Sequence, residues 1–113
     1  GENKYKIRAA KSEAAIAKYE LEEAKEKIEL QVNQQSFRVK EAEKTLARAR
    51  KNCESADENM KTANAGFKEG VIPTSDLLAA QTAWVSAHSE VIDAEINARL
   101  TQVYLKKSLG TLE

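Results

Sequence analysis

A single break divides the chain into two long segments, and both segments repeat with a seven-residue period. The break, residues 66–78, contains the only proline of the 113 residues and two of the four glycines. Glycine adopts positive φ without steric cost, and proline cannot continue a helix that needs its N–H. Residues 2–65 hold neither residue type. The sequence therefore predicts a chain reversal at the break and an all-α fold, a single hairpin of two antiparallel helices.

Signals for helix ends set the bounds of this hairpin. Thr74 or Ser75 can cap the second helix, and Asp76 falls in its first turn, where the helix dipole favours a carboxylate. The expected boundaries are a helix at about 3–68, a tip at 69–73 and a helix at about 74–109, within one unit covering 1–113. At 1.5 Å per residue, the first helix would be about 100 Å long and the second about 54 Å.

Two apolar positions in every seven residues indicate a coiled-coil seam between the helices. Small residues fill one position of the repeat on each helix: Ala49, Ala56 and Ala63 on the first, and Ala80, Ala87 and Ala94 on the second. An antiparallel register around the tip places Ala63 beside Ala80, Ala56 beside Ala87 and Ala49 beside Ala94. Such alanine pairs let helix axes approach to about 8 Å, the lower end of normal spacing.

The second helix also carries another apolar row, rotated by roughly 100° from the first in helical geometry. Its members are Leu78, Val85, Ile92, Ile96 and Val103. One partner helix cannot cover both rows, so the second row favours neighbours outside the hairpin. The unequal helix lengths also leave residues before about Val39 without an internal partner. We therefore expect the isolated chain to self-associate.

Composition agrees with long, surface-rich helices, since 32% of residues are charged and only 5% are aromatic. The formal net charge is zero, which gives no reason to expect a nucleic-acid partner. No run approaches the roughly 18 apolar residues of a membrane-spanning helix, and the N-terminus lacks a signal-peptide core. As given, the chain is expected to be soluble. Gly1 and the abrupt ends suggest a fragment excised from a longer protein.

No residue pattern favours catalysis, because the chain has no Gly-rich phosphate loop and no nucleophile with a plausible base. We therefore expect no enzyme activity and no cofactor. Cys53 falls on the seam and is interpreted as a packed thiol. His88 is interpreted as a boundary residue and not a metal ligand, because no second histidine, cysteine or carboxylate cluster gives ligand spacing. Gln35, in an apolar row, is a candidate for setting the register.

The motifs around the break resemble one family. A long Ala-rich helix precedes Phe67-x-x-Gly70, an Asp76-Leu77-Leu78-x-Ala80-Gln81 helix start and a closing Leu109-Gly110-Thr111-Leu112 segment. Together they resemble the C-terminal helical hairpin of the TolC family of outer-membrane efflux proteins, over almost the whole chain. By this resemblance Gly70 matches the tip glycine, and Asp76 matches the acidic residue that starts the return helix.

The resemblance implies that the hairpin is a stave of a periplasmic α-barrel, built from three subunits and continuous with a β-barrel in the outer membrane. The chain would then be part of the passive exit duct of a tripartite pump, with a periplasmic adaptor and an inner-membrane transporter as partners. The implied docking and entrance tip consists of Phe67, Gly70, Val71, Ile72 and Asp76. Where well-known members carry a tyrosine and an arginine that latch the entrance, this chain has Phe67 and Ile72.

Two other functions fit a helical hairpin: a generic coiled-coil scaffold, and the helical hairpin of a periplasmic adaptor protein. The apolar surface of the second helix discriminates between them and a barrel stave. A free arm needs one apolar stripe, and a stave needs two. The two rows of this sequence favour the stave, and they do not exclude a scaffold that forms bundles.

Overall fold

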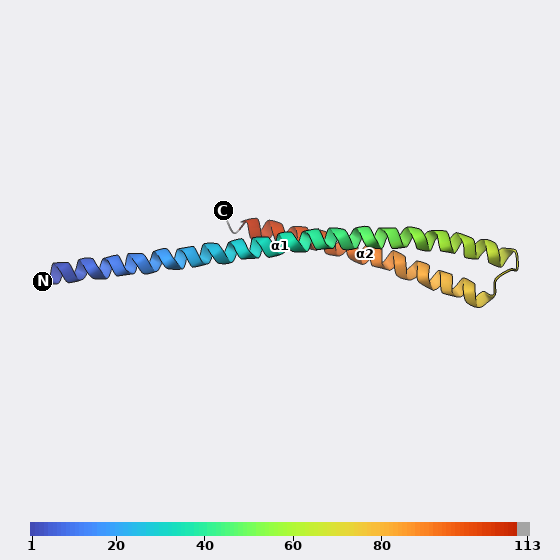
Figure 1. Cartoon of the computed structure of the whole chain (residues 1–113), viewed down its shortest axis with the longest axis horizontal. Helices are drawn as coiled ribbons and strands as arrows, with labels where there is room; N and C mark the ends of the chain where they lie inside the picture. Colours follow the sequence, from blue (N-terminus) through green and yellow to red (C-terminus); the bar gives the residue numbers. More distant parts are fainter. Residues whose placement is uncertain (111–113) are drawn as a thin grey trace.

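The computed structural model describes residues 1–110, which form two helices joined by a short tip (Figure 1). Helix α1 comprises Glu2–Lys68 and helix α2 comprises Thr74–Gly110. The described residues contain no strand. The prediction of an all-α antiparallel hairpin is confirmed.

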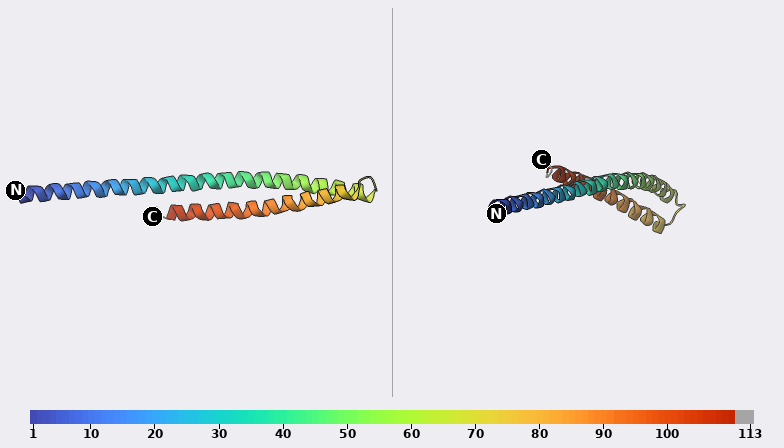
Figure 2. Two further views of the ribbon diagram at one scale, coloured as in Figure 1. Left: turned by 90° about the horizontal axis from the view of Figure 1, so that it is seen from below. Right: turned by 60° about the vertical axis from the view of Figure 1, so that its left-hand side comes forward.

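The molecule is a rod with principal extents of 102 × 21 × 13 Å. Its length is that of α1, whose 67 residues span about 100 Å at the helical rise. Helix α2 returns along only the second part of α1, so the N-terminal part of α1 projects alone (Figures 1 and 2). The two helices therefore share one interface over roughly half the rod.

Small side chains fill the core of this interface. In the described part of the chain every buried residue is small: Ala42, Ala49, Ala56, Ala87, Ala94, Ala98 and Thr101. The hydroxyl of Thr101 donates to the Ala98 carbonyl at 2.9 Å, which satisfies the one buried polar side chain among them. Larger apolar residues such as Leu46 and Val91 flank this row and are half-buried. The core is thin because it lies between only two helices.

Pairing extends further toward the N-terminus than the expected limit near Val39. Val32 and Ile28 are half-buried, whereas Leu21 is 56% exposed. The expected limit was wrong because the register that places Ala49 beside Ala94 already places the last turn of α2 beside residues before Val39. None of the helices described here is long and apolar enough to cross a membrane.

Candidate functional site: the hairpin tip and the two faces of helix α2

The tip closes α1 with a pair of backbone hydrogen bonds around a left-handed glycine. Val71 N–H donates to the Gly66 carbonyl at 2.9 Å, and Gly70 N–H donates to the Phe67 carbonyl at 3.0 Å. This is the Schellman pattern, which satisfies carbonyls that a helix end leaves without partners. Gly70 has a φ of 73°, a backbone conformation that residues other than glycine rarely adopt. The glycine therefore fixes the direction in which the chain leaves α1.

Helix α2 begins one residue earlier than a Thr74 or Ser75 cap would require. The Pro73 carbonyl accepts hydrogen bonds from the N–H groups of Asp76, at 3.1 Å, and Leu77, at 3.4 Å. Pro73 therefore occupies the N-cap position, and the two hydroxyl residues lie inside the first turn. Among the described residues neither hydroxyl makes a hydrogen bond to the helix end. The expectation of a side-chain cap is therefore wrong.

The structure brings the five tip residues named in the sequence together at one end of the rod. Phe67 is 44% exposed in the last turn of α1, and Val71 is 75% exposed in the turn. Ile72 is half-buried because it folds back over Gly66, where an added Cβ would lie 3.2 Å from the Ile72 Cγ2 atom. The tip therefore offers an apolar surface, with the exposed carboxylate of Asp76 in the first turn of α2.

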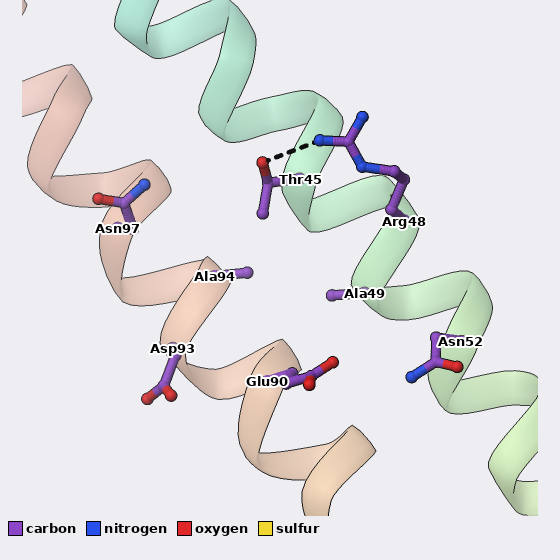
Figure 3. Close-up of a pocket in the computed structure, with 8 residues that line it drawn as sticks. All are labelled: Thr45, Arg48, Ala49, Asn52, Glu90, Asp93, Ala94 and Asn97. Carbon is purple, nitrogen blue, oxygen red and sulfur yellow. Dashed lines mark hydrogen bonds between the residues drawn. The ribbon is translucent and has the colours of Figure 1, made fainter.

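The seam alanines differ in burial along the rod. Ala49 and Ala94 point toward one another across the interface (Figure 3), and Ala56 and Ala87 are buried as well. Ala63 and Ala80, nearer the tip, are half-buried. Arg50 and Glu95, the residues after Ala49 and Ala94 in the sequence, form an ion pair at 3.6 Å between the helices.

A shallow groove runs over the Ala49–Ala94 contact. Polar side chains line its rim: Thr45, Arg48, Asn52, Glu90, Asp93 and Asn97 (Figure 3). The Arg48 guanidinium donates to the Thr45 hydroxyl at 3.3 Å within this rim. We interpret the groove as the solvated margin of a narrow seam, since alanines leave space that longer polar side chains border.

The second apolar row of α2 lies outside the seam. Its five members are all more than half exposed: Leu78, Val85, Ile92, Ile96 and Val103, at 53–59%. By contrast, Ala87, Ala94, Ala98 and Thr101 on the facing side of α2 are 2–8% exposed. Helix α1 therefore covers only one of the two apolar rows.

A polar cluster bridges the helices about midway between the tip and the Ala49 layer. The Asp57 Oδ1 atom on α1 accepts a hydrogen bond from Trp84 Nε1 at 2.7 Å and lies 2.8 Å from His88 Nε2 on α2. The Trp84 and His88 rings contact each other with their centroids 4.0 Å apart and their planes tilted by 35°. These contacts lower the pKa of Asp57. The hydrogen bond with His88 makes the largest contribution, and the hydrogen bond from Trp84 makes the next largest.

Cys53 lies one helical turn before Asp57 and joins the same cluster. The ligating atoms of Cys53, Asp57 and His88 all lie within 4.8 Å of one another. Partial burial raises the pKa of the Cys53 thiol, and the Asp57 and Glu54 charges add to the effect. The sequence-based argument that no cysteine or carboxylate comes near His88 is therefore wrong. It examined spacing along the chain, whereas the register of the hairpin brings these side chains together.

Gln35, the candidate for setting the register, lies half-buried in α1. Its Oε1 atom is buried and has no hydrogen-bond partner among the described residues. A buried acceptor without a partner destabilises its surroundings.

The fold defines a class of protein: a long helical hairpin whose return helix leaves one apolar face uncovered. A protein-family model described as outer membrane efflux protein matches residues 1–111. The chain belongs to this family, and the resemblance to TolC-family efflux proteins is confirmed. Comparison with curated proteins and with solved structures gave no match. The family is one of outer-membrane transport channels rather than enzymes, so the chain is a component of such a channel.

Proposed function

We propose that the hairpin is a wall segment of a trimeric efflux duct, with its tip at the periplasmic entrance. In this arrangement hairpins from neighbouring subunits pack side by side into an α-helical barrel. The duct is passive, and an inner-membrane transporter supplies the energy. A periplasmic adaptor docks at the tip and connects the duct to the inner-membrane transporter.

The uncovered apolar row of α2 carries this proposal. Leu78, Val85, Ile92, Ile96 and Val103 remain 53–59% exposed in the hairpin. Complete burial of one such side chain contributes about 1.5–3 kcal/mol. A continuous row of five gives a strong tendency toward helix association, and a soluble monomer rarely leaves such a row in water. The neighbouring hairpin of a barrel supplies the missing cover.

The tip supports docking by its shape and chemistry. The Schellman turn at Gly70 fixes the backbone, and the exposed side chains of Phe67 and Val71 stand on this turn. A rigid apolar tip suits an adaptor surface, since little conformational entropy is lost on binding. Phe67 carries no hydroxyl, so any closure of the entrance would use groups other than a tyrosine latch.

Cysteine cross-linking in the intact membrane-bound protein tests the barrel. The natural thiol is removed by Cys53→Ser, and single cysteines are introduced by Val103→Cys on α2 and Lys40→Cys on α1. The register that places Ala49 beside Ala94 puts these two positions at the same level of the rod. We expect covalent dimers and trimers when the two positions are combined, because neighbouring hairpins bring these faces together. A matched control moves the second cysteine to Leu21, in the projecting part of α1.

The outcome also discriminates among the alternatives. An adaptor-like arm or a scaffold fits the same fold, and the family membership leaves the position within the channel open. Only monomers after oxidation, with the hairpin still helical by circular dichroism, would contradict the barrel and favour a free arm. Cross-linked dimers that never proceed to trimers would favour a scaffold that forms a two-hairpin bundle.

A further inference from the structure

The cluster around Asp57 contains three residue types that each occur once in the chain. The chain has one cysteine, one histidine and one tryptophan, and all three meet at the Asp57 carboxylate. Cys53 and Asp57 are four residues apart and share one face of α1. His88 faces them from α2. The seam therefore carries a thiol, a carboxylate and an imidazole at a single point.

We propose that Cys53, Asp57 and His88 form a binding site for a divalent transition-metal ion of the Zn²⁺ type, held between α1 and α2. Sulfur, nitrogen and carboxylate oxygen are the donors that Zn²⁺ takes in proteins. This donor set disfavours Mg²⁺ and Ca²⁺, which prefer oxygen ligands alone. The site is independent of the proposed duct, because it lies within one hairpin.

The distances are close to those that tetrahedral coordination requires. Zn–S bonds of about 2.3 Å and Zn–N or Zn–O bonds of about 2.1 Å place neighbouring ligand atoms about 3.4–3.6 Å apart. In the hairpin, His88 Nε2 and the Asp57 Oδ1 atom are 2.8 Å apart, and all three ligand atoms lie within 4.8 Å. Changes of roughly 1 Å therefore suffice, which side-chain rotation can supply without moving either helix.

The surroundings suit a ligand set of three side chains and a water molecule. The Asp57 and His88 side chains are 46% and 37% exposed, so an ion can enter from solvent and keep a water in its fourth position. Trp84 Nε1 donates to the Asp57 Oδ1 atom at 2.7 Å and orients the carboxylate. Hydrogen bonds of this kind, to the ligands and not to the ion, tune metal sites.

Binding converts the Cys53 thiol to a thiolate and releases one proton to solvent. His88 would bind through Nε2, so its ring hydrogen resides on Nδ1. The hydrogen bond between His88 and Asp57 is then replaced by two bonds to the ion. An ion held this way links the two helices directly, and we expect it to raise the thermal unfolding temperature of the hairpin.

Titration of the reduced chain with Co²⁺, a spectroscopic substitute for Zn²⁺, tests the site. We expect one equivalent to bind, with the visible bands of tetrahedral Co²⁺ and an ultraviolet thiolate-to-cobalt band. Added Zn²⁺ should displace both signals. Cys53→Ser should abolish the ultraviolet band. Asp57→Asn and His88→Gln should each weaken binding more than about tenfold, since losing only a hydrogen-bond partner of a ligand already costs about 10–100-fold.

Two controls keep the test decisive. Asp93→Asn removes an exposed α2 carboxylate outside the cluster and should leave affinity and spectrum unchanged. Circular dichroism verifies that each variant is helical, and Trp84 fluorescence gives a second signal from within the cluster. An octahedral Co²⁺ spectrum in the unaltered chain, or unchanged affinity in Cys53→Ser, would overturn the proposal and leave a hydrogen-bonded cluster only. Affinity that rises with chain concentration would also overturn it, because the ion would then bridge two copies.

Discussion

The two apolar faces of α2 meet different environments in the same chain. One face is small and buried: Ala87, Ala94 and Ala98 are 2–7% exposed against α1. The other face is large and more than half exposed, as at Val85 and Ile92. A chain that folded alone would bury its large residues first, because they contribute most on burial. The reversed order indicates that the internal seam sets a close helix spacing and leaves the larger apolar residues uncovered. In the proposed duct, neighbouring subunits would cover them.

The largest expected effect comes from polar substitution of the exposed face. In the intact channel, Ile92→Lys combined with Ile96→Lys should lower the yield of trimer more than about tenfold, because two side chains lose burial worth about 1.5–3 kcal/mol each. The isolated hairpin should keep its stability within about 0.5 kcal/mol. Native electrophoresis and urea unfolding measure the two quantities. Asn97→Lys, at an exposed position about 100° around the helix from Ile96, is the control. Equal loss of trimer in that variant would contradict the assignment of the face.

On the buried face of α2, added side-chain volume should lower the stability of the hairpin itself. Ala94→Leu inserts a bulky side chain opposite Ala49 and should destabilise the hairpin by about 1–3 kcal/mol. Ala83→Leu makes the same change at an exposed α2 position and should alter stability by less than about 0.5 kcal/mol. Urea unfolding of the two variants side by side measures the difference. Similar values for both would show that the seam is not closely packed.

Acid should lower the stability of the hairpin by protonating Asp57, which bridges the two helices. The pKa of Asp57 is lower in the fold than its ordinary value of 3.8 because His88 and Trp84 stabilise the carboxylate. Its contribution is therefore present above pH 3.8 and is lost as the pH falls through the lower folded value. With a chelator present, Asp57→Asn should flatten the acid limb of a plot of unfolding temperature against pH. An unchanged acid limb would show that other carboxylates dominate it.

The smallest effect is expected for the Arg50–Glu95 ion pair. Its atoms are 3.6 Å apart, and the side chains are 60% and 45% exposed. Solvent and salt screen such a pair, so Arg50→Gln should cost at most about 0.5 kcal/mol and less in high salt. Urea unfolding at two salt concentrations measures it. A loss above about 1 kcal/mol that persists in salt would mean that the pair fixes the register of the two faces.

The sequence was sufficient for the architecture because the determining signals are local. Gly70 and Pro73 mark the reversal, and the seven-residue repeat defines the face of α2 that contacts α1. The start of α2 was harder to predict, since hydroxyl residues often cap helices and here the Pro73 carbonyl takes that position. The cluster of Cys53, Asp57 and His88 was missed because the two α1 residues lie 31 and 35 positions before His88 in the sequence. Only the register of the two helices, applied to polar as well as apolar positions, could have found them.

Thiol accessibility on the exposed face tests the central claim most directly. Ile92→Cys, in a background of Cys53→Ser, is labelled with a maleimide in the intact channel and in the isolated chain, which is diluted until it sediments as a monomer. Burial by a neighbouring hairpin should slow labelling in the channel at least about tenfold, which corresponds to protection of about 1.4 kcal/mol. Equal labelling rates in the two states would contradict the claim that other subunits cover this face.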